Sequence, residues 1–487
     1  GYVFITKLLY IKKGAGFNDT ICFPMRMLRL MRLNTFSFYS LLTLLVWLPI
    51  PLGSNRIWAW SIAGVWVGTT LIAAVLSFRS HWQAFPFQRL NQFKWLILPI
   101  AIFQFWTALQ LLPMSELPLT FMSPMASLAY EQTHFITHTP GLGCMSVVAF
   151  TTYSSLIKGL VYLLFIVLAI VLINTEKRIK WVLSALLLSG CFQAVYGALV
   201  LLFGFEFSPV FGIRLPDVAT GSFIYKNHLA NYMMMCLCLG AGLLVSQLHV
   251  SSSGSWHIPI QRWVSGLISN KMVVRCGLIM MVIALVMTRS RMGNTAFFAA
   301  TLIGGFTALL FYNQKPRALV ALVISLVLID TVVVGSLFGL SKVKDRLEQT
   351  AMEKETRVEV VDWGALMVEQ APLTGYGLGS FHSTFPRFSF WNIGYYDHAH
   401  NEYLQFAVES GLPMTLMLGT MLFVALYKTI QTMRKRRSKT MKGTALGCYM
   451  AIVGMLIHIS VDFNLQPSAN AMTFLMVLVL VGVSSVL

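Results

Sequence analysis

The sequence predicts an all-α protein that crosses a membrane about twelve times and carries one large loop on its outer face. Hydrophobic residues make up 56% of the chain and charged residues only 11%, with a mean hydropathy of +0.70. This composition excludes an ordinary soluble protein of 487 residues, which needs a charged surface. Apolar runs close to the roughly 20 residues needed to cross a bilayer recur along the chain.

The apolar runs divide the chain into four regions. An N-terminal extension (1–33) precedes nine predicted spans within 34–339, and a polar loop (340–407) separates them from three spans within 408–487. Helices satisfy every backbone polar group inside a bilayer, so each run is predicted to be helical. The twelve predicted spans are 35–51, 58–78, 95–112, 155–173, 181–203, 228–248, 273–288, 293–312, 318–339, 408–427, 444–461 and 470–486.

The N-terminal extension is basic and begins at Gly1, so Met25 or Met27 is an alternative natural start. A cleaved signal peptide is the other alternative, but no small-residue cleavage site follows the first apolar run. That run is therefore predicted to be the first membrane span.

Charge is distributed unevenly between the two sides of the predicted spans. Two thirds of the 36 Lys and Arg residues lie in the N-terminal extension and in every second polar segment after it. Only two of the 18 Asp and Glu residues, Asp19 and Glu176, lie in that set. The positive-inside rule therefore places both termini in the cytoplasm. Because this orientation accounts for the formal charge of +18, no nucleic-acid partner is expected.

The longest polar interruption, 356–411, is predicted to close over an active site on the outer face. In its run DHAHNEYLQFAVESG, His398 and His400 stand two residues apart. A histidine with an ordinary pKa of about 6.5 can accept a proton at neutral pH. The neighbours that can orient one of them are Asn401, Glu402 and Glu409. Upstream, an apolar stripe predicts a helix along the membrane face; it consists of Val358, Val361, Ala365 and Val368.

Two shorter outer segments contribute basic residues. Residues 204–232 place Arg214 and Lys226 before a span, and TRSRMGN at 288–294 lies where two spans meet. ATP and nucleotide sugars are not expected outside the cell, so the energy for a transfer reaction must arrive with the substrate. A lipid-linked diphosphate meets this need, and arginine makes bidentate, permanently charged contacts with it.

Each of these features also has a structural interpretation. A single arginine at the membrane surface commonly extends its head group into the interface. Asp397 or Asn401 is a suitable N-cap for the helix that follows. His134 and His138 have helical spacing, but no carboxylates accompany them, so solvated loop histidines are expected. No CxxC or HExxH motif occurs, and we expect no metal site.

The chain is similar to the O-antigen ligase and polymerase (Wzy-type) superfamily of bacterial membrane glycosyltransferases. Several pieces match the family pattern in order over about 210–415, and the number of spans fits the flanks. The matching pieces are GSFIYKNHLANY, TRSRMGN, Arg357 with Trp363, PLTGYGLGSF at 372–381, HNEYL at 400–404 and ESG at 409–411.

The resemblance implies a GT-C-like fold in the bacterial inner membrane, with a helical periplasmic loop and chemistry that needs no metal or cofactor. It implies that Arg214 and Arg291 bind the lipid-linked diphosphate, with Arg289 as an alternative to Arg291. It also implies that His400 activates the acceptor. The residues predicted to bind substrate around them are Arg289, Lys226, His228, Arg357, His398, Asn401 and Glu402.

The implied donor is an undecaprenyl-diphosphate-linked glycan, and three acceptors stay open. A ligase would use lipid A core, a polymerase another repeat unit, and a protein oligosaccharyltransferase a protein hydroxyl; ligase is favoured, with polymerase close behind. A transporter or flippase is the alternative from another class. Against it, the two halves show no internal repeat, and the polar residues gather in outer loops rather than at mid-membrane.

Overall fold

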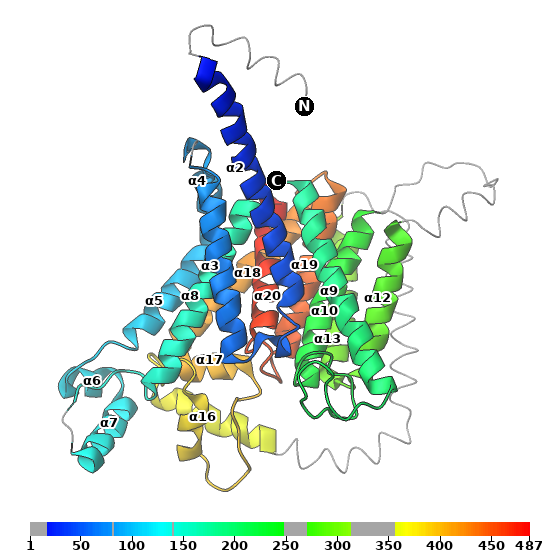
Figure 1. Cartoon of the computed structure of the whole chain (residues 1–487). Coiled ribbons are helices and arrows are strands. Elements are labelled where there is room, and N and C mark those ends of the chain that lie inside the picture. The colour runs from blue at the N-terminus through cyan, green and yellow to red at the C-terminus, as the bar shows by residue number, and fades with distance from the viewer. Residues whose placement is uncertain (1–16, 80–81, 139–140, 248–269, 313–355) are drawn as a thin grey trace.

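Helices form all the regular elements in the described residues, which are 17–79, 82–138, 141–247, 270–312 and 356–487 of this computed structural model (Figure 1). Two isolated β-bridges are the only strand-like pairings among them. The prediction of an all-α membrane protein is confirmed.

All but one of the predicted spans overlap a helix of one bundle over most of their length (Figure 1). The exception, 318–339 with Asp330, lies outside the described residues. Among the described residues, eight helices are long and apolar enough to cross a membrane, and a bent pair that ends in α5 adds a ninth candidate. The helices at predicted spans are α2 (Phe17–Trp47), α3 (Ile57–Leu76), α5 (Lys94–Leu109), α8 (Ala149–Leu172), α9 (Glu176–Leu202), α10 (Lys226–Ser246), α12 (Asn270–Met287), α13 (Arg291–Phe311), α18 (Leu412–Lys435), α19 (Lys439–His458) and α20 (Ser468–Val486).

The centre of the bundle consists of α10, α19 and α20, most of whose residues are buried. Glycines let α10 and α19 approach closely. A Cβ on Gly242 would lie 2.4 Å from the carbonyl oxygen of Gly443 and 2.9 Å from the Cα of Gly447. Small residues four apart are the usual means of close helix packing in membranes. The turn between α19 and α20 therefore starts and ends on helices whose residues are mostly buried.

Several shorter helices gather at one end of the bundle, which we call the loop end (Figure 1). They are α6 (Glu116–Met122), α7 (Pro124–Thr137), the helix 356–370, α16 (Phe381–Thr384), the 3-10 turn η3 (Phe385–Arg387) and α17 (Glu402–Ser410). A separate small core holds the 356–410 segment together; it includes Val360, Trp363, Met367, Tyr376, Phe381 and Phe385.

The helix 356–370 buries a different face from its predicted apolar stripe. Val360, Trp363 and Met367 point into the small core, whereas Val358 and Val361 are exposed. Ala365 is exposed as well, whereas Val368 is half-buried and packs against the small core, so three of the four stripe residues lie on the outside of the molecule.

The predicted span 408–427 begins later than expected, because its first residues belong to α17. Gly411 separates the two helices with φ of +82°, a conformation that favours glycine. A Cβ on it would lie 2.2 Å from the carbonyl oxygen of Leu373. As a result α17 forms a separate element at the loop end, and α18 runs along the bundle.

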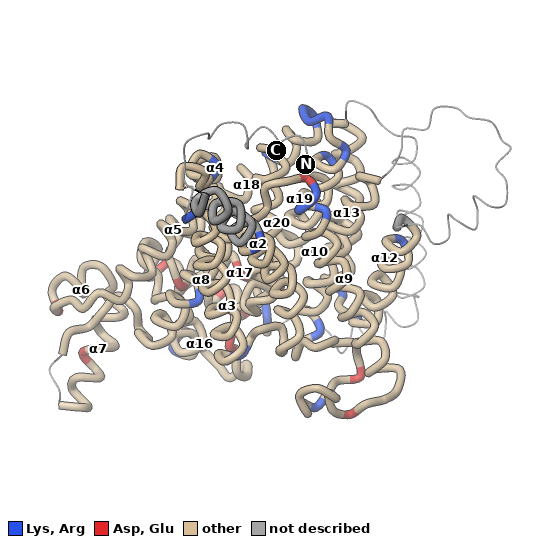
Figure 2. Tube along the Cα trace, turned by 45° about the horizontal axis from the view of Figure 1, so that its top comes forward, with Lys and Arg blue, Asp and Glu red and all other residues tan. Residues whose placement is uncertain are grey.

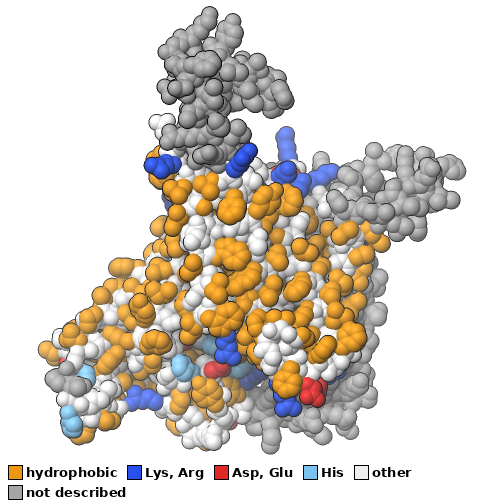
Figure 3. All heavy atoms as spheres, in the orientation of Figure 1, with side chains coloured by type: hydrophobic (Ala, Val, Ile, Leu, Met, Phe, Trp, Pro, Cys, Tyr) orange, Lys and Arg blue, Asp and Glu red, His pale blue; other side chains and the backbone are white. Residues whose placement is uncertain are grey.

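Hydrophobic side chains cover the middle of the bundle, and charged side chains gather towards its two ends (Figures 2 and 3). The C-terminus and the first turns of α2 lie at the end opposite the loop end (Figure 1). The described end of α18 and the start of α19, which contain Arg434, Lys435 and Lys439, are also at that end. This arrangement suits a protein embedded in a bilayer with both termini on one side.

Candidate functional site

The loop end brings His400 next to Asp462. His400 immediately precedes α17, and Asp462 lies in the turn between α19 and α20. Nδ1 of His400 is 3.7 Å from Oδ1 of Asp462, with 17% of the histidine side chain exposed and 2% of the aspartate. The backbone of His400 has φ of +49°, an uncommon conformation for a residue with a side chain. Asn401 caps α17 by accepting a hydrogen bond from Leu404 N (3.2 Å), which fixes the chain just after His400.

Asp462 is held from two sides. Its Oδ1 accepts a hydrogen bond from Phe463 N (3.0 Å), and its Oδ2 accepts one from Asn227 Nδ2. Burial opposes ionisation of this carboxyl group. The contact with His400, the nearby His458 and His228, and the Phe463 amide outweigh burial and lower its pKa. A buried carboxylate beside a partly exposed imidazole is the result.

The ring of Phe463 brings three histidines together. His398 stacks on it with centroids 4.5 Å apart, and His400 and His228 meet it edge to face at 4.8 and 5.0 Å. His228 is buried in the first turn of α10. Tyr225 stacks on the same ring at 5.6 Å. Segments more than 230 residues apart in the sequence therefore share one aromatic contact.

A second polar chain leads from His398 to Glu409. Nδ1 of His398 is 3.0 Å from Nε2 of Gln405, which also donates to Oε1 of Glu409 (3.2 Å). Burial lowers the pKa of His398 to about 4, so that its imidazole is neutral at pH 7. Burial raises the pKa of Glu409 to about 7, although the amides of Gly379 (2.9 Å) and Phe381 (3.3 Å) donate to its carboxyl group. Glu409 thereby fixes the glycine-rich turn 375–379 against α17.

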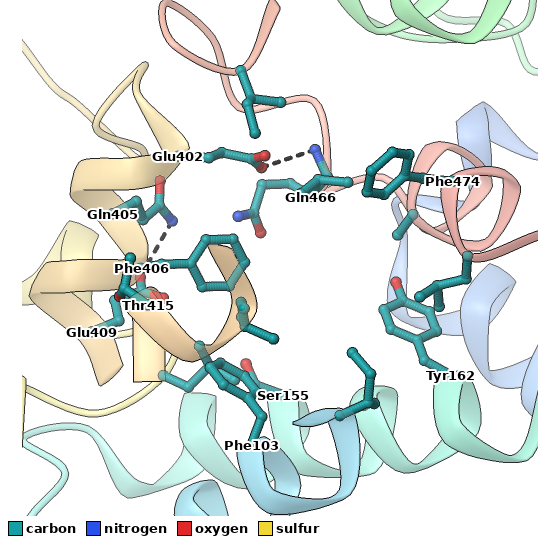
Figure 4. Close-up of a pocket in the computed structure, with 18 of the residues that line it drawn as sticks. Phe103, Ser155, Tyr162, Glu402, Gln405, Phe406, Glu409, Thr415, Gln466 and Phe474 are labelled. Carbon is teal, nitrogen blue, oxygen red and sulfur yellow. Dashed lines mark hydrogen bonds between the residues drawn. The ribbon is translucent and has the colours of Figure 1, made fainter. Parts of the chain in front are cut away.

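Glu402 is buried and contacts the segment between α19 and α20 (Figure 4). Its Oε1 accepts a hydrogen bond from Leu465 N (2.8 Å), and its own backbone N–H donates to the carbonyl oxygen of Ile459 (2.9 Å). Burial raises the pKa of its carboxyl group well above the ordinary value. Glu402 therefore attaches α17 to the α19–α20 turn.

The arginines predicted to hold a diphosphate lie in two segments that pack together at the loop end. Arg214 is exposed in the loop 203–225, and Arg289 and Arg291 are exposed in the α12–α13 turn. The two segments are joined by a hydrogen bond from Ala219 N to the carbonyl oxygen of Met287 (3.1 Å).

The start of α13 also approaches His458, which acts electrostatically on Asp462. A Cβ on Gly293 would lie 3.3 Å from Cε1 of His458, the last residue of α19. Of the other predicted residues, Lys226 is half-buried at the first position of α10, directly before Asn227. Arg357 is half-buried beside Thr356, which accepts a hydrogen bond from Tyr396 OH (3.0 Å). The ring centroid of Tyr396 lies 5.8 Å from that of His400.

The sequence analysis did not single out Asp462 or Phe463. A signal was present, because the short gap between the last two spans reads SVDFNLQP and holds an acid at the membrane boundary. Ionisable residues at membrane depth usually have a partner or a function. The partner, however, is 62 positions away in the chain, and only the fold brings it to His400.

The arrangement is suited to proton transfer. The nitrogen of His400 nearest the carboxylate is Nδ1, so Nε2 is left to act on a substrate hydroxyl. Asp462 can orient the imidazole and stabilise its positive charge. In the part of the chain that the structure describes, no group of three or more His, Cys, Asp or Glu residues is arranged to hold a metal ion.

Residues 276–419 match the family model described as O-antigen ligase. The matched stretch contains the α12–α13 turn, the helix 356–370 and His400, whereas Arg214 and Asp462 lie outside it. No curated protein matches the chain.

Proposed function

We propose that this chain, a member of the O-antigen ligase and polymerase superfamily, transfers a glycan from undecaprenyl diphosphate to an acceptor hydroxyl. We place the reaction at the periplasmic face of the bacterial inner membrane, with both termini in the cytoplasm. The distribution of Lys and Arg between the two sides supports this orientation. The observation that carries the proposal is the His400–Asp462 pair, whose histidine lies within the matched segment.

In the proposed reaction, Nε2 of His400 removes the proton from the acceptor hydroxyl as its oxygen attacks the anomeric carbon of the donor. The new glycosidic bond forms while the bond between that carbon and the diphosphate oxygen breaks. Undecaprenyl diphosphate leaves with the bonding electrons, and the proton remains on His400, where Asp462 stabilises it. Arg291 and Arg214 neutralise the charge that develops on the leaving diphosphate, which is usually the largest catalytic contribution.

The direct test is transfer in vitro from undecaprenyl-diphosphate oligosaccharide to lipid A core, with EDTA present. We expect transfer without added metal, and a loss of at least about 100-fold in kcat for His400→Ala, which removes the general base. Arg291→Ala should lower kcat/KM by a similar factor. If both variants assemble glycan normally while movement of the lipid-linked substrate fails, the protein is a transporter and the proposal is wrong.

The ligase is our first proposal, and a repeat-unit polymerase and a protein oligosaccharyltransferase follow it. Cells deleted for the protein separate the first two. Accumulation of unattached lipid-linked polymer indicates a ligase, whereas accumulation of single lipid-linked repeats indicates a polymerase. If both assemblies are normal and a glycoprotein is lost, the acceptor is a protein.

A further inference from the structure

The loop that follows α9 begins with a short hairpin, residues 203–215, at the loop end (Figure 1). Gly204 ends the helix with φ of +66°. Its N–H donates to the carbonyl oxygen of Leu201 (3.2 Å), and the N–H of Phe205 donates to that of Val200 (3.1 Å). These two bonds form a Schellman motif, which reverses the chain at a helix end. The hairpin therefore starts exactly where a helix long enough to cross the membrane stops.

Backbone pairing gives the hairpin a defined face. Two hydrogen bonds lie on either side of the opposed pair Phe207 and Arg214, and one of them joins Ser208 N to the carbonyl oxygen of Ile213 (2.7 Å). Side chains of a directly opposed pair project from the same face of the two strands. Oγ of Ser208 is also 3.0 Å from the hydroxyl oxygen of Tyr196, which ties the hairpin to α9. Arg214 thus stands beside the ring of Phe207.

The hairpin and the last residue of α9 expose large apolar side chains to about half of their area or more. This aromatic patch consists of Leu202, Phe203, Phe205, Phe207 and Val210. It continues the exposed apolar side of α9, where Leu188 and Leu199 lie. Trp58, exposed at the start of α3, is close to it, since its ring centroid is 6.4 Å from that of Phe211. The patch is therefore continuous with the outer surface of two candidate membrane spans.

A lipid surface fits the composition of the aromatic patch. Apolar patches of this kind are rarely left in water. Aromatic side chains are enriched where a membrane protein crosses from hydrocarbon to head groups, and a neighbouring arginine extends its guanidinium towards the lipid phosphates. Arg214 stands in that relation to Phe207, and both belong to a loop attached to the end of a candidate span.

We propose that the hairpin 203–215 inserts its aromatic patch into the outer leaflet of the bilayer and thereby holds Arg214 at the depth of the lipid phosphates. The membrane contact is independent of the proposed reaction, whereas the benefit to donor binding rests on the proposed function. The same loop bonds to the α12–α13 turn through Ala219 N and the carbonyl oxygen of Met287. An anchored hairpin would therefore also steady the turn that carries Arg291.

The first experiment replaces single residues with the photoreactive amino acid p-benzoylphenylalanine, which is close in shape to the aromatic residues it replaces. Phe205 and Phe207 are the test positions, Leu188 is the reference within α9, and Tyr395 is the matched control. Tyr395 is an exposed aromatic residue of the loop end in the segment between η3 and α17. The protein is irradiated in nanodiscs of phosphatidylethanolamine and phosphatidylglycerol, and phospholipid adducts are counted by mass spectrometry.

We expect adducts at Phe205 and Phe207 within about twofold of those at Leu188, and at least about tenfold more than at Tyr395. Adduct yields no higher than that of Tyr395 would place the aromatic patch in water and overturn the proposal. Adducts to polypeptide in place of lipid would also overturn it, because a second copy or another protein would then cover the patch.

The second experiment tests the position of Arg214 through donor binding. Phe205→Ser combined with Phe207→Ser removes no buried contact, because both rings are exposed. We expect it to raise KM for the undecaprenyl-diphosphate donor at least about fivefold with kcat unchanged, since Arg214 loses its fixed depth. Phe135→Ser, at an exposed ring on α7, should leave both constants unchanged.

An unchanged KM in the double variant would overturn the claim that the hairpin positions Arg214. Photolabelling needs no turnover, so it separates this proposal from the reaction. If no transfer is detected with any acceptor while Phe205 and Phe207 label lipid, the proposed function fails and the membrane anchor stands.

Discussion

Replacing Asp462 with Asn tests whether its charge serves His400. The two side chains are 3.7 Å apart, at which distance a full charge pair is worth about 4 kcal/mol for an effective dielectric constant of about 20. In bulk water the same pair is worth about 1 kcal/mol. The site lies between these limits, because His400 is partly exposed and Asp462 is not. Asp462→Asn should therefore lower kcat by about 10- to 1,000-fold, with little change in KM.

The substitution also disturbs two hydrogen bonds, and a second change separates this effect from the electrostatic one. The Asp462 carboxylate accepts from Asn227 and from Phe463 N, so an amide at 462 must turn its NH₂ towards one of these donors. Asn227→Asp combined with Asp462→Asn exchanges donor and acceptor and restores the pairing. It leaves the negative charge on α10 instead of beside His400.

The assay is single-turnover transfer together with thermal unfolding in the same detergent. We expect the double variant to recover the stability that Asp462→Asn loses, about 1–3 kcal/mol for a mispaired buried group. Its transfer rate should stay low. Asp362→Asn, which changes an exposed acid on the helix 356–370, should leave both quantities unchanged. Full recovery of rate in the double variant would show that Asp462 is only a structural residue and would refute our reasoning.

Three further predictions concern the contacts that hold α17 against its neighbours, through Glu409, Glu402 and Gly411. The pKa of Glu409 rises from 4.5 to about 7 on folding, so stability should fall as pH increases from about 4.5 to 7, and Glu409→Gln should remove that slope in thermal unfolding. A wild-type stability that rises over this range would contradict the assignment. Burial raises the pKa of Glu402 and so favours its neutral form, so Glu402→Gln should retain the Leu465 contact and most transfer activity, whereas Glu402→Ala should lose about 1–3 kcal/mol of stability. If Glu402→Gln and Glu402→Ala lose the same amount of stability, Glu402 acts as an anion. Gly411→Ala should destabilise the protein by at least about 1 kcal/mol, since its Cβ meets Leu373, whereas Gly68→Ala should not; equal melting temperatures would rule out this clash.

The spans could be predicted because each depends on its own apolar run. All but one of the predicted segments fall in helices, and the remaining one lies outside the described residues. The boundary at 408 was wrong by four residues, because the hydrophobicity of α17 resembles that of the span behind it. The turn that separates them depends on the backbone conformation of Gly411, which an apolar pattern does not report.

The site could be predicted only in part. The motif around His400 is local, and the sequence alone marks it as a candidate for proton transfer. Its contact with Asp462 depends on how α17 lies across the α19–α20 turn, which is a property of packing between distant segments. The same holds for His228, whose place at the Phe463 ring comes from the close approach of α10 and α19.

The attachment of α17 also suggests why the site is built on this turn. Asp462 lies between two of the most buried helices, so its carboxylate has little freedom to move. His400 lies on a segment that is joined to this turn through Glu402 and to the glycine-rich turn through Glu409. The distance between base and carboxylate is therefore set by the docking of one short helix.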